Sequence, residues 1–135
     1  IVGFPGEGAA DFQDSYEFAT SMAFSNMHIF PYSTRPGTSA AHLPDHTKEP
    51  EKKRRVALMM ASAEQGFLAF RKHQFGQTRQ VLWESSRMKG GSGMWSGLTE
   101  NYVRVRTESS KELGNTITNT LISRIVDGQV LADVL

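Results

Sequence analysis

Cysteine is absent from all 135 residues of this sequence. Its absence excludes a fold that depends on disulfide bonds, and it excludes an iron–sulfur cluster held by thiolates of these residues. Long apolar runs are absent too, since no stretch approaches the roughly 18 residues that suggest a membrane-spanning helix. With 39% hydrophobic and 21% charged residues, the composition is typical of a globular protein. We therefore expect no membrane partner.

Basic residues are missing from residues 1–34, so all 15 Lys and Arg residues lie in residues 35–135. The first segment contains only acids among its Asp, Glu, Lys and Arg positions, and the bases are dense over residues 68–107. A basic part joined to an acidic one predicts a polyanionic partner for the basic part. An ordinary solvated surface explains the same charge equally well.

The chain opens on IVGFPGE, without a methionine. Ile1 and Val2 are typical of the end of a buried strand, and the following Gly and Pro residues predict a turn that leads to Glu7. A buried strand needs sheet neighbours on both sides. We therefore expect that an earlier, N-terminal part of the same chain is missing from this sequence.

The first half of the chain predicts alternating helices and strands. Apolar residues recur at helical spacing over about residues 9–24, and residues 27–31 (MHIFP) resemble a short buried strand. Together with the opening residues they predict a βαβ unit of a parallel sheet. A polar loop over residues 32–47 then leads to a second helix, which begins near Pro50 and ends near Gln74.

From residue 77 onward the pattern is that of short strands separated by turns. Residues 101–107 (NYVRVRT) alternate, with Val103 and Val105 on one face and Tyr102, Arg104 and Arg106 on the other. Short strands over about 60 residues predict a small antiparallel β-barrel. The expected fold class is thus an α/β segment followed by a small all-β barrel.

Two motifs carry a resemblance to a known family. The segments IVGFPGE and HIFPYSTRPGT resemble the end of the catalytic domain of radical S-adenosylmethionine methylthiotransferases. The resemblance implies the last βαβ unit of a partial, TIM-like barrel in residues 1–47 and a connecting helix in residues 48–75. It also implies an OB-like, RNA-binding TRAM domain in residues 76–135.

Within that family, HIFPYSTRPGT followed by GLTENYVRV is most similar to the branch that methylthiolates N6-threonylcarbamoyladenosine next to the tRNA anticodon. The resemblance implies a cytoplasmic tRNA-modifying transferase whose partner is the tRNA anticodon arm. Three alternatives stay open. They are action on isopentenyladenosine in tRNA, action on an aspartate of a ribosomal protein, and a stand-alone RNA-binding module without catalysis.

The resemblance also implies a cofactor site. Val2, Gly3 and Glu7 belong to the motif that borders the adenosyl group of S-adenosylmethionine, and Phe30 lies close to the same ligand. Without the resemblance, GFPGE is read as a tight turn with a solvent-facing acid. The family requires 4Fe-4S clusters held by cysteines, and this chain has none. We therefore expect no cofactor or cluster to be bound to this chain alone, and no activity from it alone.

Two further features of the same region follow from the resemblance. Ser33 and Arg35 lie in the loop after the second motif, facing either the substrate or the rim of the barrel. Gly8 stands where the family commonly has a Thr that caps the next helix, which predicts a less stable helix start.

The barrel segment contains candidate RNA-binding residues that do not depend on the family alone. Tyr102, Arg104 and Arg106 combine charge with an aromatic surface on one face, as proteins that bind exposed bases do. Arg87 and Lys89 flank a glycine-rich turn and are placed to reach a phosphate. These five residues are the expected RNA-binding set.

The tryptophans and histidines are the remaining candidates for base stacking and for metal binding. Trp83 lies in an apolar strand and is expected in the core, whereas Trp95, beside glycines, is equally compatible with exposure and base stacking. Only His42 and His46 of the histidines lie close together in the sequence. A zinc site needs more ligands than that, so we expect no metal site.

Overall fold

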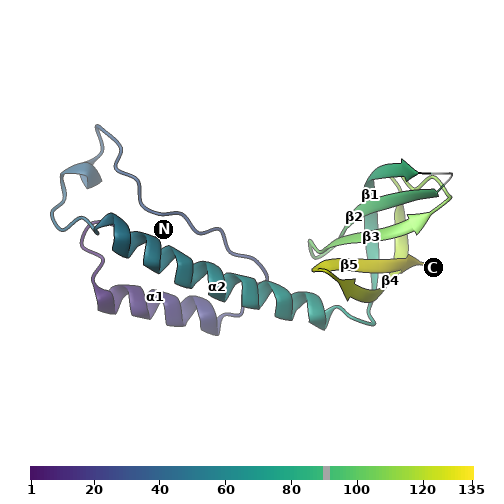
Figure 1. Cartoon of the computed structure of the whole chain (residues 1–135), viewed down its shortest axis with the longest axis horizontal. Coiled ribbons are helices and arrows are strands. Elements are labelled where there is room, and N and C mark those ends of the chain that lie inside the picture. The colour runs from purple at the N-terminus through teal and green to yellow at the C-terminus, as the bar shows by residue number, and fades with distance from the viewer. Residues whose placement is uncertain (90–91) are drawn as a thin grey trace. The chain divides into compact units, whose positions relative to one another are not determined.

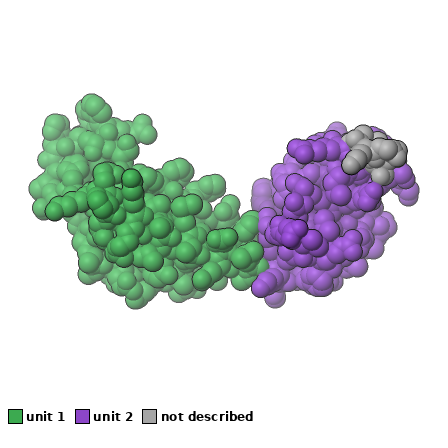
Figure 2. Space-filling view, viewed as in Figure 1, with its two compact units in different colours: residues 1–70 green, residues 71–135 purple. Residues whose placement is uncertain are grey.

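The structure, a computed structural model, describes residues 1–89 and 92–135, and the side chains of residues 88, 89 and 92 lie outside that description. The chain divides into two compact units, residues 1–70 and residues 71–135 (Figure 2). Each unit is described by itself below. The expected division into residues 1–47, 48–75 and 76–135 stays a prediction.

Unit 1 contains helix α1 (Ala9–Ser21), the short 3-10 helix η1 (Ser39–His42) and most of helix α2 (Glu49–His73) (Figure 1). Both expected helices are confirmed. Helix α1 ends at Ser21, earlier than expected, and Ala23 adopts a positive φ of 47° that no helix accommodates. At its start Gly8 offers no capping side chain, but a carboxylate oxygen of Asp11 accepts the N–H of Gly8 at 2.8 Å.

The strand expected over residues 27–31 does not form, and this expectation was wrong. The segment makes one isolated parallel bridge, Val2 to Pro31, with hydrogen bonds from Val2 N to Phe30 O and from Tyr32 N to Val2 O. The pairing cannot extend because Gly3 turns away with a φ of +78°. The parallel direction agrees with the expectation, but a βαβ unit with full strands is not present among the described residues.

Helix α2 buries polar side chains instead of an apolar stripe. Its buried residues are Lys52, Arg55 and Ser62, while Met60 is 59% exposed. Ser62 and Thr20 of α1 share a hydrogen bond of 2.9 Å between their hydroxyls. Gly66 lies against the backbone at Phe24, because a Cβ on Gly66 would stand only 2.6 Å from the Phe24 carbonyl oxygen. The side of α2 that faces α1 is therefore built from small and polar residues.

Unit 2 is a closed barrel of five strands. They are β1 (Thr78–Lys89), β2 (Ser92–Thr99), β3 (Arg104–Ser109), β4 (Ile117–Val126) and β5 (Gln129–Val134), in the order β1-β2-β3-β5-β4 (Figure 1). The expected barrel is confirmed, with one correction: β3 and β5 pair in parallel. Closure leaves no unpaired edge among the five described strands, because β1 pairs with both β2 and β4.

The barrel core follows the alternation of the strands. Val81, Trp83 and Val105 are completely buried, and Ile122 and Val130 close the interior from β4 and β5. The indole N–H of Trp83 donates to the Thr118 hydroxyl at 2.8 Å, which satisfies its polar atom. The expected core position of Trp83 is therefore confirmed.

Candidate functional site

The outer side of strands β1, β2 and β3 forms a polar surface that we call the basic face. Arg87 of β1 stands opposite Met94 of β2, and Ser96 of β2 stands opposite Arg106 of β3. These residues surround a hollow of about 190 Å³, lined by Ser85, Ser86, Arg87, Met94, Ser96 and Arg106. Hydroxyls and guanidinium groups around a small hollow match the chemistry of a phosphate.

A β-bulge places Arg87 on this face. Counting by twos from the buried Trp83 would point Ser85 and Arg87 into the core. The register against β2 shifts between Trp83 and Ser85, so that Ser85 pairs with Ser96 and turns outward. Bulges are a known way to redirect side chains. Ser85 and Ser86 were not predicted as site residues from the sequence. The sequence signal for the bulge is an arginine, Arg87, that lies an even number of residues after a core tryptophan, Trp83.

The three arginines of the basic face differ in how far their charge is compensated. Arg104 forms an ion pair with Glu84, with 2.6 Å between Nη1 and Oε2. Arg106 Nη1 donates to the neutral Gln129 amide oxygen at 2.8 Å, which orients the side chain and leaves its charge intact. Arg87 is exposed and has no hydrogen bond or ion pair within the described residues. Arg87 and Arg106 are therefore better placed than Arg104 to attract an anion.

The two aromatic candidates for base stacking, Tyr102 and Trp95, differ in their exposure. Tyr102 is 84% exposed, in the turn between β2 and β3, where it has a positive φ of 64°. Trp95 is only 3% exposed, which excludes it from stacking on an RNA base. Tyr102 precedes β3 and does not belong to the strand alternation that holds Arg104 and Arg106. The side chain of Lys89 lies outside the described residues.

Unit 1 contains a second candidate site. A pocket of about 600 Å³ is lined by Ile1, Phe4, Phe30, Pro31, Tyr32, Ser33, Arg35, Thr38 and Ala40. Its volume lies in the range of small-molecule sites, which are mostly apolar with a few polar groups. Phe30 is 59% exposed, and Ser33 and Arg35 supply the polar groups. Phe30, Ser33 and Arg35, all singled out in the sequence, thus line one pocket.

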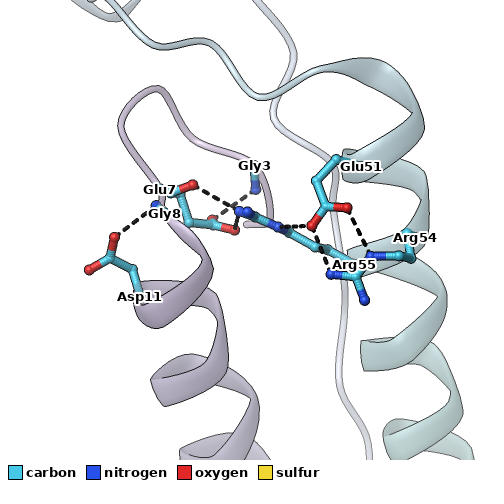
Figure 3. A network of polar contacts seen from close by, with 7 residues as sticks. All are labelled: Gly3, Glu7, Gly8, Asp11, Glu51, Arg54 and Arg55. Atoms are coloured by element: carbon cyan, nitrogen blue, oxygen red, sulfur yellow. Dashed lines mark hydrogen bonds and ion pairs between the residues drawn. The ribbon is translucent and has the colours of Figure 1, made fainter.

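Residues 3–8, which we call the glycine loop, contribute Phe4 to this pocket, whereas Val2, Gly3 and Glu7 are not among its lining residues. Glu7 ties the loop together. Its carboxylate accepts the N–H of Gly3 at 2.8 Å and pairs with Arg55 of α2 at 2.7 Å (Figure 3). Val2, just before the loop, is buried. The solvent-facing reading of Glu7 was therefore wrong, because its side chain is only 14% exposed.

Glu51 and the neighbouring arginines shift one another's pKa values. Hydrogen bonds from Arg54 and then Arg55 lower the pKa of Glu51 to about 2. Burial opposes the charged form of Arg55, but its hydrogen bonds with Glu51 and Glu7 outweigh burial and raise its pKa. Glu51 and Arg55 therefore remain charged near neutral pH.

The family resemblance implies two kinds of cofactor, S-adenosylmethionine and iron–sulfur clusters. An iron–sulfur cluster does not fit, because the chain has no cysteine. In residues 1–89 and 92–135, no group of three or more His, Asp or Glu side chains is arranged to hold a metal ion. The same residues include no helix that is both long and apolar enough to cross a membrane. The Phe30 pocket is large enough for a nucleoside-sized ligand.

The chain was also compared with known proteins. No protein-family model matches it. It is 41% identical over 104 residues to the threonylcarbamoyladenosine tRNA methylthiotransferase MtaB of Thermotoga maritima, covering 77% of this chain and 23% of that protein. The protein of the same name from Aquifex aeolicus is 37% identical over 118 residues, with 87% and 27% covered.

A relative whose name gives a different substrate matches almost the whole chain. The tRNA-2-methylthio-N(6)-dimethylallyladenosine synthase of Shewanella denitrificans is 32% identical over 131 residues, covering 97% of this chain and 26% of that protein. The chain thus spans about a quarter of the length of the curated relatives it matches.

Proposed function

Because this chain belongs to the methylthiotransferase family, we propose that it is the tRNA-binding part of such an enzyme, with one edge of its cofactor site. The intact enzyme is a cytoplasmic radical S-adenosylmethionine enzyme with 4Fe-4S clusters, which adds a methylthio group to N6-threonylcarbamoyladenosine next to the anticodon. The barrel of unit 2 is its TRAM domain. The chain alone is inactive, because the cluster ligands must come from cysteines outside it.

The observation that carries this proposal is the basic face. Arg87 and Arg106 flank a hollow lined by hydroxyls, and neither is neutralised by an acid within the described residues. Such a surface holds the phosphate backbone of the anticodon arm, while the exposed ring of Tyr102 offers a stacking platform for a base. Arg104 joins them once it is released from Glu84, and Lys89 adds charge from the end of β1.

In unit 1, Val2, Gly3, Glu7 and Phe30 border S-adenosylmethionine. The half-exposed ring of Phe30 and the pocket beside it receive the adenosyl group, while Gly3, which the stem of Lys52 covers, fixes the adjoining loop. When bound in the intact enzyme, this cofactor supplies the radical and methyl chemistry. The residues of this chain bind and orient it.

A second substrate is favoured by one observation. The dimethylallyladenosine synthase of Shewanella denitrificans matches 97% of the chain, more than either threonylcarbamoyladenosine relative. The alternative substrate of the intact enzyme is therefore isopentenyl-type adenosine in tRNA. Stem-loops that carry each modification discriminate between the two.

The experiment that tests the function is mapping of RNA contacts by NMR. The complete 135-residue chain is titrated with an anticodon stem-loop, and amide shifts are followed. The proposal predicts that the shifts concentrate on the outer residues of β1, β2 and β3 and on the turn at Tyr102. Shifts confined to β4, or no shifts at low salt, would contradict it, and the latter would favour a protein substrate.

A further inference from the structure

Helix α2 places two buried cations against the glycine loop and the segment that carries Phe30. Lys52 is 8% and Arg55 is 5% exposed, although these side chains are rarely buried unless they are paired. They stand three residues apart and so lie on the same side of the helix. Neither residue was singled out from the sequence, because both lie in an ordinary-looking run of charged residues.

Arg55 connects three parts of unit 1. Its Nη1 donates to the Glu7 carbonyl oxygen at 2.9 Å and to Glu7 Oε1 at 2.7 Å, and its Nε donates to Glu51 Oε1 at 2.9 Å (Figure 3). The guanidinium carbon lies 5.3 Å from the centre of the Phe12 ring of α1. This buried group therefore ties the first turn of α2 to the glycine loop and to α1.

The ion pair also determines where the other oxygen of Glu7 points. While Oε1 is held by Arg55, Oε2 accepts the N–H of Gly3. Gly3 has a φ of +78°, which side chains disfavour. The carboxylate thus closes the glycine loop from its first residue to its fifth, and Arg55 fixes the carboxylate.

Lys52 holds the same residue from the opposite direction. A Cβ on Gly3 would stand 2.7 Å from Lys52 Cγ, so the aliphatic stem of Lys52 covers this glycine directly. Its ammonium donates to the Tyr32 carbonyl oxygen at 3.0 Å and pairs with Glu49 at 2.6 Å. Tyr32 is in turn bonded to Val2. Lys52 therefore holds the glycine loop and the Phe30 segment together.

We propose that Arg55 and Lys52 are positioning residues, which fix the backbone of the glycine loop against the segment that carries Phe30. Glu7 then serves the site by orienting the Gly3 backbone, through Arg55. The importance of this arrangement for catalysis rests on the proposed function, in which the glycine loop borders the cofactor.

The test uses the Gly3 amide of the complete chain as a reporter. Its proton resonance is displaced by the hydrogen bond to a carboxylate, and its hydrogen exchange is slowed. Arg55→Ala is expected to move this resonance towards the shift of an unbonded amide and to speed exchange by roughly tenfold or more. Arg55→Lys retains one charged donor and is expected to recover part of both effects.

The neighbouring Arg54→Ala is the matched control, because Arg54 bonds to Glu51 but does not touch the glycine loop. For Lys52, Lys52→Met keeps the stem over Gly3 and removes the ammonium, with exposed Lys53→Met as its control. Lys52→Met is expected to speed exchange at the Tyr32 amide while the Gly3 amide changes less.

An unchanged Gly3 resonance in folded Arg55→Ala, or an equal change in Arg54→Ala, would overturn the proposal. Resonances of α1 and of the barrel report whether each variant is folded. If Arg55→Ala unfolds unit 1, Arg55→Met keeps an aliphatic stem beside Phe12 and leaves the Glu7 acceptor unchanged, so it tests the same point with a smaller perturbation. RNA binding is measured on the same samples: its absence in the wild type counts against the proposed function and leaves the loop result intact.

Discussion

The guanidinium of Arg104 and the carboxylate of Glu84 lie 2.6 Å apart on the outside of the barrel, and both side chains are about half exposed. Exposed pairs of this kind stabilise a protein little. The pair has a larger effect on the charge of this surface, because Glu84 compensates one of the arginines of the proposed RNA interface.

Glu84→Gln is therefore expected to strengthen binding of an anticodon stem-loop, by about two- to fivefold at low salt. The change frees the charge of Arg104 without altering the shape of residue 84. Glu64→Gln, an exposed residue of α2, changes the net charge by the same amount and is the control. Equal gains in both variants in a fluorescence anisotropy titration would show that only overall charge matters.

Arg106→Ala is expected to weaken RNA binding more than Arg104→Ala does. Arg106 is oriented by the neutral Gln129, whereas Arg104 must first give up an ion pair. A lost charged contact of this type costs about 1.5–3 kcal/mol. Arg124→Ala, on β4, controls for the loss of one exposed arginine. The account fails here if Arg104→Ala proves the more damaging of the two.

Tyr102→Phe is expected to bind RNA as the wild type does, and Tyr102→Gly is expected to lose about 1–3 kcal/mol of binding free energy, which is the value of one stacked base. Glycine suits the positive φ of 64° at this position, so thermal stability should not fall. Melting curves recorded with the titrations separate the two effects. Unchanged binding by Tyr102→Gly would remove Tyr102 from the interface.

Acid is expected to weaken unit 1 through Glu51. Its pKa falls from the ordinary 4.5 to about 2 in the folded chain, chiefly through the hydrogen bond from Arg54. A depressed pKa means that the stabilisation is complete above pH 4.5 and is lost as the pH falls towards 2. The protection factors for hydrogen exchange over the first turns of α2 should therefore fall in that window. Glu51→Gln should flatten this dependence.

Gly66→Ala provides a test in which two effects have opposite signs. Alanine favours a helix by about 1 kcal/mol over glycine. The new Cβ would however stand 2.6 Å from the Phe24 carbonyl oxygen, and overpacking of this kind costs about 1–3 kcal/mol. Hydrogen exchange of α1 and α2 amides is expected to show a net loss of stability. A net gain would show that the Phe24 segment moves easily.

The barrel was predictable because its signal is local. Val103 and Val105 alternate with Arg104 and Arg106, and the structure places the valines inside and the arginines outside. The strand over residues 27–31 was not predictable in this way, because a strand depends on partners that are distant in sequence. Among the described residues, Val2 alone pairs with this segment.

Three lining residues of the unit 1 pocket were singled out from the sequence, whereas the roles of the expected site residues stay predictions and the contacts of Glu7 were not foreseen. Phe30, Ser33 and Arg35 do line one pocket, and the resemblance to methylthiotransferases is confirmed by relatives 32–41% identical. The ion pair between Glu7 and Arg55 spans 48 positions, and no periodicity of the sequence connects the two. The bulge after Trp83, which turns Arg87 outward, likewise depends on the register with β2.

The central claim is that Arg87 and Arg106 bind RNA phosphates. Its most direct test is the salt dependence of stem-loop binding by the complete chain, compared with the Arg87→Ala, Arg106→Ala double variant. Each lost phosphate contact lowers the slope of log K against log salt concentration by about 0.7–0.9. The account predicts weaker binding and a slope reduced by about 1.4–1.8. An unchanged slope would contradict it and would show that the basic face is an ordinary solvated surface.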